Sequence, residues 1–246
     1  HVDDFDGLLR RVEASLAPKG LVAIDFHHVL GLADGQFDVV AHTHPTFVNS
    51  LTCSPGWDVN LAGRMFPDFV LSDGADLPAA PLQMLVVEAE FAFRMERDLP
   101  QRAKAYNVDE VRAAVAYLHL AIEVPDARFE PFDNIGPAQI AADDAFASWF
   151  VLGPKVADWA RRDLPKQTVR VFKNGAVAAE GTGANALGDP SVALTWLANE
   201  RAKRGPALKA GEVITTGTCI TPLGIAPGDA IVADFPGLGR VCVNLT

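Results

Sequence analysis

Apolar residues recur at helical spacing in four segments of the chain. The predicted helices span residues 5–16, 108–118, 137–146 and 190–204. The last of these has the clearest boundaries. Asp189 is placed to cap its first turn, Pro190 stands at its first position and Gly205 follows its end.

Short apolar runs rich in β-branched and aromatic residues predict strands between these helices. They span residues 21–24, 37–41, 84–94, 120–124, 149–152, 169–172, 176–179, 212–216, 229–235 and 239–245. Asn174-Gly175 separates two of them and predicts a two-residue hairpin turn.

Strands outnumber long helices in the second half of the chain, and this favours an α+β fold. We expect the sheet to be mixed and curled, with helices at its periphery. The stretch from residue 53 to residue 81 is rich in Gly, Asp and Pro, which predicts a boundary between an N-terminal part and the main core. We therefore expect a small N-terminal α/β part over residues 1–80 and a core over residues 81–246.

The composition is that of a globular protein and excludes several classes of partner. The chain has 246 residues, 49% of them hydrophobic, so a large core can be buried. A net charge of −10 without a concentrated basic face argues against nucleic acid. We expect no membrane association, because no run of 18 apolar residues or signal-peptide pattern is present. Three cysteines without metal-type spacing suit a reducing compartment, so we expect a cytoplasmic protein.

Two acidic residues, Glu88 and Glu90, stand inside an apolar strand. Residues two apart project to the same face, so the two carboxylates share one side while Val87, Ala89 and Phe91 take the other. Two carboxylates 4 Å apart repel by about 4 kcal/mol at an effective dielectric of 20. They must bind a cation, share a proton or face water. The alternative to a binding site is an exposed sheet face with alternating Glu.

Glu123 is a third acid within an apolar run, from Leu118 to Val124. Three acids embedded in apolar strands suit an oxygen-ligated Mg²⁺ or Mn²⁺ with open positions for water and substrate. The sequence therefore predicts a divalent-metal site formed by Glu88, Glu90 and Glu123. Spacing alone does not place Glu123 beside the other two.

An ordered set of motifs from residue 84 to residue 243 carries a resemblance to a known family. The motifs include Val87-Glu88-Ala89-Glu90-Phe91, Arg97-Asp98-Leu99-Pro100, Ala121-Ile122-Glu123-Val124-Pro125-Asp126-Ala127-Arg128, Gly181-Thr182-Gly183, Leu187-Gly188-Asp189-Pro190 and Pro227-Gly228-Asp229. Each motif alone is modest, and the ordered set is strong. In these residues the chain resembles the 2-oxopent-4-enoate hydratase and 4-oxalocrotonate decarboxylase group of the fumarylacetoacetate hydrolase superfamily.

The resemblance implies a fumarylacetoacetate hydrolase-like curled sheet or barrel, a metal held by the three glutamates, and a homo-oligomer. It also implies a small 2-oxo or 2-hydroxydienoate acid as substrate, with the metal stabilising an enolate before water is added or CO₂ is lost. Thr216 aligns with a family position near the metal. Asp143 is the acid retained from the family's Ala-Asp-Asn-Ala-Ser signature, which here continues with Asp144-Ala145-Phe146. We expect Asp143 and Thr216 at the substrate.

The N-terminal part departs from the family pattern at positions that carry chemistry. The family's lysine-bearing stretch matches residues 38–45, which have no lysine but contain His42 and His44, and the family's next acid falls near Arg64. A histidine pKa of about 6.5 suits proton transfer, so we expect His42 and His44 as proton carriers. Arg64 is a candidate clamp for a substrate carboxylate. A surface turn before Pro45 and a surface salt bridge are the respective alternatives.

Three functions remain open at this point. The first is a metal-dependent lyase, a hydratase or decarboxylase acting on a small 2-oxo or 2-hydroxydienoate acid. The second is a C–C hydrolase or isomerase of an acylpyruvate. The superfamily's hydrolases usually have an aspartate as third ligand and a catalytic His–Glu pair, so Glu123 disfavours this function while His42 and His44 leave it open. The third is a diverged, non-catalytic ligand-binding or partner subunit. The missing lysine suggests it, but the retained carboxylates oppose it because an uncompensated cluster destabilises a fold.

Overall fold

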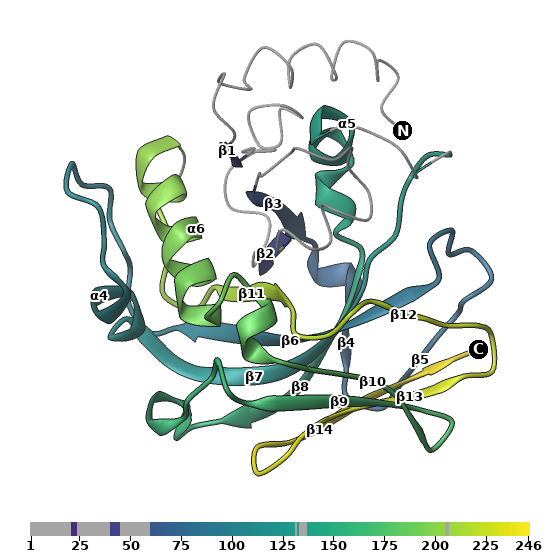
Figure 1. The fold of residues 1–246 in the computed structure, drawn as a ribbon. Helices are drawn as coiled ribbons and strands as arrows, with labels where there is room; N and C mark the ends of the chain where they lie inside the picture. The colour runs from purple at the N-terminus through teal and green to yellow at the C-terminus, as the bar shows by residue number, and fades with distance from the viewer. Residues whose placement is uncertain (1–20, 24–39, 45–59, 131, 133–136, 205–206) are drawn as a thin grey trace.

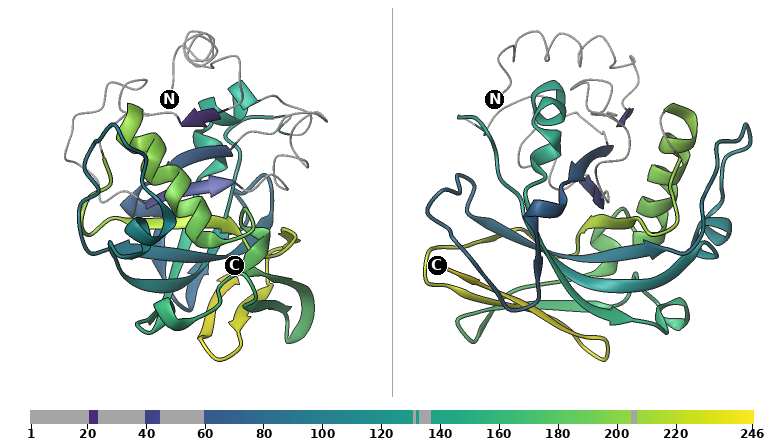
Figure 2. Two further views of the ribbon diagram at one scale, coloured as in Figure 1. Left: turned by 60° about the vertical axis from the view of Figure 1, so that its left-hand side comes forward. Right: turned by 180° about the vertical axis from the view of Figure 1, so that it is seen from behind.

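Two stacked β-sheets form the body of the molecule (Figure 1). The structure, a computed structural model, describes residues 21–23, 40–44, 60–130, 132, 137–204 and 207–246. Two further views show the same layers, with α5 and the end of the large sheet that contains β2 and β3 on the side away from the small sheet (Figure 2).

The large sheet has nine strands in mixed orientation. In spatial order they are β1 (Leu21–Ala23), β3 (Asn60–Met65), β2 (Val40–His44), β11 (Val213–Thr218), β6 (Val86–Met95), β7 (Val115–Val124), β8 (Trp149–Val156) and β4 (Val70–Ser72), with β12 (Leu223–Gly224) paired to β6. The order runs from β1 to β4 as an open path, so among the described strands this sheet is curled and does not close into a barrel.

The small sheet has five strands and lies below the large sheet in Figure 1. Their order is β10 (Ala176–Thr182), β9 (Thr168–Lys173), β13 (Ala230–Phe235), β14 (Gly239–Leu245) and β5 (Ala75–Leu77). The predicted Asn174-Gly175 hairpin joins β9 to β10, and both turn residues have the positive φ that such turns require, 52° and 82°.

The main hydrophobic core fills the space between the two sheets. Phe91 and Phe93 of β6 and Leu118 of β7 are fully buried in it, and the Phe91 ring packs 5.1 Å from that of Phe235 in β13. These residues alternate with others that project from the opposite side of the large sheet, as the strand period of two requires.

A second, smaller apolar cluster lies on that opposite side. Its buried members are Met65, Ala92, Ala121, Ala147, Phe150 and Val213. They come from β3, β6, β7, β8 and β11 and from the turn before β8, so strands that are not neighbours in the sheet meet at one cluster. The large sheet therefore curls around these residues, and we call this side its concave face.

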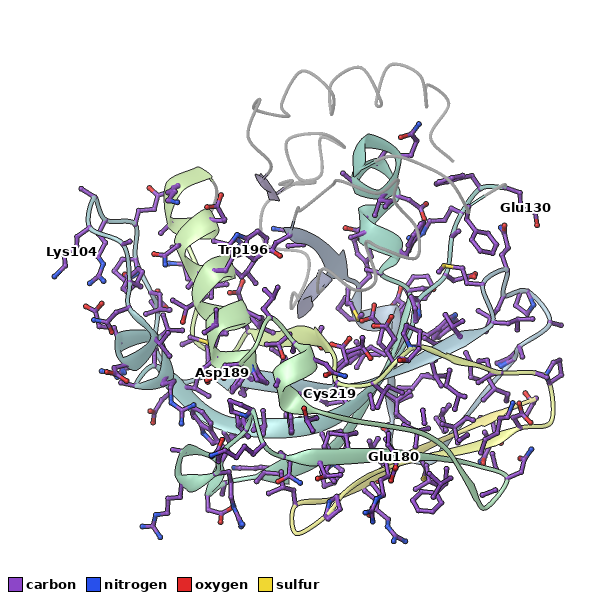
Figure 3. All side chains as sticks on the ribbon, viewed as in Figure 1. Lys104, Glu130, Glu180, Asp189, Trp196 and Cys219 are labelled. Carbon is purple, nitrogen blue, oxygen red and sulfur yellow. The ribbon has the colours of Figure 1, made fainter. Side chains whose placement is uncertain are left out.

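Short helical segments surround the sheets, and one long helix stands beside β11 (Figure 1). They are α4 (Val108–Arg112), α5 (Pro137–Ala142) and α6 (Pro190–Arg204), with 3₁₀ turns η1 (Pro67–Phe69), η2 (Asp144–Phe146), η3 (Trp159–Arg161) and η4 (Gly183–Asn185). Asp189 lies at the base of α6 (Figure 3) and accepts a hydrogen bond from the Ser191 N–H, at 2.7 Å. The predicted helix over residues 190–204 and its cap are confirmed. No helix of the described residues is long and apolar enough to cross a membrane.

The prediction of a helix over residues 108–118 is wrong beyond its first turn. Only α4 is helical, capped by Asn107 and Glu110, whose side chains each accept a hydrogen bond from the other's backbone N–H. Residues from Val115 onward belong to β7, which is ten residues long. The positions of Val115 and Leu118 are compatible with a helix as well as with a strand. Pairing of this segment with β6 on one side and β8 on the other makes it a strand.

The predicted helix over residues 137–146 ends early, because α5 stops at Ala142 and a left-handed turn follows. The predicted helix over residues 5–16 lies outside the described residues. The division at residue 80 stays a prediction. Both β4 and β5 precede that boundary, and they pair with β8 and β14 of the predicted core.

Candidate metal centre

Two central strands of the large sheet place the three predicted acids. In the β6–β7 ladder Glu88 stands directly opposite Glu123, and Glu90 stands opposite Ala121. The odd-numbered residues of β6, such as Ala89 and Phe91, enter the main core. The glutamates therefore share the concave face.

The three carboxylates converge. One oxygen from each of Glu88, Glu90 and Glu123 lies within 4.8 Å of the others. Their side chains are fully buried, with relative exposures of 2%, 0% and 0%. The alternative of an exposed sheet face with alternating Glu is therefore excluded for these residues.

Burial sets the electrostatics of the cluster. It raises the pKa of Glu88 well above its usual range, and the charges of Glu90 and Glu123 add to that rise. The pKa of Glu123 is also raised, first by burial and then by Asp144, against a lowering hydrogen bond with Glu90. Burial and the charges of Glu90 and Glu88 raise the pKa of the Cys219 thiol just beyond β11 (Figure 3). The ionised cluster is destabilised unless a cation compensates it.

A β-bulge in β11 supplies hydrogen bonds to Glu90. Thr215 pairs with Ala92 and Thr218 with Glu90, so β11 has an additional residue between the two pairs. Within it Gly217 has a φ of 93°, and its N–H donates to Glu90 Oε2 at 3.0 Å. The Thr215 hydroxyl donates to the same oxygen. Two donors therefore fix this carboxylate and favour its charged form.

A left-handed turn brings a fourth acid close to the cluster. Asp144, Ala145 and Phe146 have φ values of 57°, 57° and 63°, a conformation that costs each non-glycine residue about 1–2 kcal/mol. The Arg64 N–H donates to Asp144 Oδ1 at 2.7 Å. A Cβ at Gly63 would lie 2.0 Å from the Asp144 carbonyl oxygen, so only glycine allows β3 to approach this turn. The sequence did not predict Asp144 as a residue near the metal centre. The one sequence feature that could have indicated it is its position next to Asp143, the acid retained from the family signature.

Asp143, predicted at the substrate, faces Arg128. Its carboxylate accepts hydrogen bonds from the Arg128 N–H at 3.3 Å and lies 3.7 Å from the Arg128 guanidinium. Burial raises the pKa of Asp143 to about 7, against the lowering effect of Arg128. The substrate role of Asp143 stays a prediction.

The other predicted residues lie around the cluster at different depths. The Thr216 hydroxyl donates to the Phe91 carbonyl at 3.1 Å. The donors to the Glu90 carboxylate are the residues on either side of Thr216, which are Thr215 and Gly217. Arg64 alternates with Gly63 and Met65 along β3, so its side chain projects from the other face. There burial raises the pKa of Glu212, and the charge of Arg64 is one of the effects that oppose this rise. The structure therefore does not place Arg64 beside the three glutamates, and its clamp role stays a prediction.

His42 and His44 are described only by their backbone. They lie in β2, opposite Gly63 and Leu61 of β3. Their side chains lie outside the described part of the structure, and their catalytic role stays a prediction.

The three glutamates have the properties that a small divalent cation requires. Carboxylate oxygens are the preferred donors for Mg²⁺ and Mn²⁺. Glu88 Oε2 is buried and accepts no hydrogen bond from the described residues, and Glu88 forms no ion pair with them. The cluster therefore fits a cation that replaces the missing partners.

Comparison with known proteins gives consistent matches. The family model described as "Fumarylacetoacetate (FAA) hydrolase C-terminal" matches residues 65–246. The chain is 34% identical over 184 residues to a 2-keto-4-pentenoate hydratase of Burkholderia vietnamiensis, covering 75% of this chain and 69% of that one. It is 32% identical over 186 residues to a 4-oxalocrotonate decarboxylase of Pseudomonas putida, with coverages of 76% and 69%.

Solved structures match over the whole chain. The 4-oxalocrotonate decarboxylase from Pseudomonas putida G7, complexed with magnesium and adipate, has a TM-score of 0.78 at 24% identity and covers 100% of this chain and 98% of its own. The same decarboxylase complexed with calcium and acetate has a TM-score of 0.76 at 23% identity, with the same coverages. At these identities the likeness shows that the fold is shared.

Proposed function

The chain belongs to the fumarylacetoacetate hydrolase family, and from this premise we propose that it is a divalent-metal-dependent lyase of a small 2-oxo or 2-hydroxydienoate acid. The observation that carries the proposal is the convergence of three buried glutamate oxygens within 4.8 Å. The relatives named as a hydratase and a decarboxylase, and the structures complexed with magnesium or calcium, support it.

Glu88, Glu90 and Glu123 would hold Mg²⁺ or Mn²⁺. When bound, the cation supplies a Lewis acid that stabilises negative charge on the oxygens of a 2-oxo acid. Thr215 and Gly217 keep the Glu90 carboxylate oriented through their hydrogen bonds to Oε2. The complete burial of the three side chains keeps bulk water away, and charge interactions are stronger where water is excluded.

We propose His42 and His44 as the proton carriers, in place of the lysine that the family's pattern has. Their strand, β2, pairs in parallel with β11 through Val40–Val213 and Ala41–Ile214. Because β11 also carries Thr215, the histidine strand runs beside the strand that fixes Glu90. His42→Asn or His44→Asn should lower kcat by about 100-fold or more and leave metal affinity unchanged. A wild-type kcat–pH profile in both variants would remove this assignment.

The direct test is turnover by the purified chain. Loss of dienol absorbance from 2-hydroxypenta-2,4-dienoate would be followed with Mg²⁺, with Mn²⁺ and with excess chelator. We expect activity with metal and none with chelator. Glu88→Gln should lower kcat/KM by about 100-fold or more, because a ligand is lost. Glu180→Gln is the matched control, since Glu180 lies on the small sheet in an exposed pair with Arg170 (Figure 3).

Product analysis separates the two reactions of the group. Mass spectrometry detects a gain of water in the hydratase reaction, whereas 4-oxalocrotonate loses CO₂ in the decarboxylase reaction. If metal binds at Glu88 but neither substrate turns over, or if Glu88→Gln and Glu180→Gln are equally active, the lyase proposal is wrong.

A further inference from the structure

Four polar residues gather at the other end of the concave face, away from the glutamates. In the β6–β7 ladder Arg94 stands opposite Tyr117, and His119 stands opposite Ala92. On the next strand Lys155 stands opposite His119. These four residues have the strand parity of Glu90 and Glu123, and we call them the basic cluster. Lys155 is exposed, and the other three are partly exposed.

A β-bulge in β8 creates this cluster. Ala121 pairs with Leu152, but His119 pairs with Lys155, so β8 has one extra residue in the intervening stretch at Gly153 and Pro154. In a regular ladder Lys155 would stand opposite Leu118 and point into the main core. The bulge turns Lys155 to the concave face. The carbonyl of Gly153 lies 2.8 Å from His119 Nδ1, so an Nδ1–H donates to it and Nε2 is directed elsewhere.

The charges in the basic cluster lack acidic partners among the residues that the structure describes. Within the part of the chain that the structure describes, the Arg94 guanidinium forms no ion pair or hydrogen bond. Lys155 Nζ lies 3.8 Å from the centre of the Tyr117 ring and forms no ion pair there. Burial lowers the pKa of His119, and the positive charges of Arg94 and Lys155 lower it further. Two positive charges therefore act on His119 in a chain whose net charge is −10.

The neighbouring acid is engaged elsewhere. Glu212 precedes the partner of Arg94 on β11; it lies 3.8 Å from Arg201 and accepts a hydrogen bond from the Lys209 N–H. Basic residues on the small sheet have partners of their own, as Arg170 has in Glu180. Among the described residues, the basic cluster thus combines Arg94 and Lys155, two cations without an acidic partner, on the same face as His119.

The basic cluster is separate from the metal centre. Ala92, Ala121 and Phe150 lie between them on the same face and are completely buried. Glu123 is four positions beyond His119 along β7, a distance of roughly 13 Å at about 3.3 Å per residue. A small 2-oxo acid at the glutamates cannot reach across this dry layer.

We propose that Arg94, His119 and Lys155 form a second binding site, one for a small molecule that carries a phosphate or two carboxylates. Arginine offers a planar pair of N–H donors that matches such oxygens, and lysine adds a compact positive charge. His119 Nε2 supplies a further donor when the ring is protonated. The shared chemistry is a group with two negative charges, which can neutralise Arg94 and Lys155, cations that have no acidic partner in the described part of the chain.

The test is an NMR titration of the full chain at constant ionic strength. Inorganic phosphate and succinate are added in separate experiments, and the imidazole signal of His119, assigned with His119→Gln, is followed. We expect a saturable shift, and a rise in the His119 pKa on binding because Arg94, Tyr117 and Lys155 then surround a bound anion. Whichever of the two anions, phosphate or succinate, has the lower dissociation constant identifies the ligand class as a phosphate or a dicarboxylate.

Variants decide whether the cluster is responsible. Lys155→Met and Arg94→Met should each weaken binding by about tenfold, since each removes charge-assisted hydrogen bonds. Arg170→Met, which removes a paired cation from the small sheet, should leave binding unchanged. Lys155 is exposed, so its variant keeps the fold even if the Arg94 variant does not.

Three outcomes would overturn the proposal. One is the absence of any saturable shift of His119. Another is a shift that persists unchanged in Lys155→Met, or that requires Mg²⁺ and so reports anion at the metal centre. The third is a change in sedimentation mass of Lys155→Met without a phosphate or succinate response, which would assign the cluster to contacts between copies of the chain.

Discussion

The two ends of the concave face contain opposite charges in opposite surroundings. At one end Glu88, Glu90 and Glu123 are completely buried. At the other end Arg94 is partly exposed and Lys155 is exposed. A β-bulge shapes each end, in β11 beside the acids and in β8 beside the bases. A β-bulge therefore helps to form both the buried acidic site, which excludes water, and the exposed basic cluster, which is in contact with water.

The difference teaches how burial decides what a cluster of like charges needs. Charges in contact with water are solvated and screened, so an exposed cluster costs the fold little. Buried charges lose that solvation and must be neutralised by a proton or a counter-charge. The acidic end therefore depends on bound protons or a cation for stability, while the basic end does not depend on an anion.

The largest expected effect is at the acidic end. Glu123→Gln should lower metal affinity by about 100-fold or more, because it replaces one of the three charged ligands. Isothermal titration with Mg²⁺ and Mn²⁺ measures the change. Equal affinity in this variant and in Glu180→Gln would break the comparison, since the buried acids would then behave like exposed ones.

The second effect concerns the bulge beside the acids. Thr215→Val keeps the shape of the side chain but removes a donor to Glu90 Oε2, and we expect metal affinity to fall by about 10- to 100-fold. Thr216→Val is the matched control, because the Thr216 hydroxyl donates to the Phe91 carbonyl. If the two variants lose the same affinity, the donor to Glu90 has no special role.

The third effect is a pH dependence of stability from Asp143, whose pKa is about 7 in the fold against a usual value of 3.8. The folded state keeps a proton that the unfolded state has lost, so the stabilisation falls as pH rises from about 4 to about 7. Asp143→Asn removes this titration and should gain about 3 kcal/mol at pH 7 relative to pH 4, at about 1.4 kcal/mol per pKa unit. Urea unfolding at both pH values, with Mg²⁺ present, measures it.

His119 should give a pH dependence of stability opposite in sign to that of Asp143. Its pKa is lowered, so the unfolded state binds the proton more readily and stability falls as pH decreases below about 6.5. His119→Gln should remove this smaller dependence. If the free energy of unfolding has the same pH dependence in His119→Gln and Asp143→Asn, burial does not govern the pKa shifts of both residues.

The smallest effect is at the exposed end. Lys155→Met should change the free energy of unfolding by less than about 0.5 kcal/mol, because its charge is solvated and its only described contact is the Tyr117 ring. A thermal unfolding curve measures it. A loss of several kcal/mol would indicate that the basic end is as dependent on its charges as the acidic end.

The sequence predicts the elements with strong local signals. The capped helix α6 and the Asn174-Gly175 hairpin were placed correctly, because caps and turn residues act within a few positions. The pair Glu88 and Glu90 followed from the strand period of two. The third acid, Glu123, was found by its apolar surroundings, although only the β6–β7 register places it opposite Glu88.

The features that were missed depend on pairing between distant segments. Nothing local marks the bulges that aim Gly217 at Glu90 or Lys155 at His119, since a bulge exists only relative to its partner strand. The left-handed turn at Asp144 follows a sequence that favours helix, and the close approach of β3 fixes it instead. Val115 and Leu118 fit a helix until β6 and β8 pair with their segment.

The direct pairing of Glu88 with Glu123 has a consequence for the order of events during folding. Like charges directly opposite one another disfavour a strand pair, and here they stand at one end of the longest ladder of the large sheet. The newly made chain must close this ladder against repulsion, or wait until a cation or protons reach it. Refolding at neutral pH should therefore be faster with Mg²⁺ in the buffer, so the supply of the ion acts on assembly of the protein as well as on its chemistry.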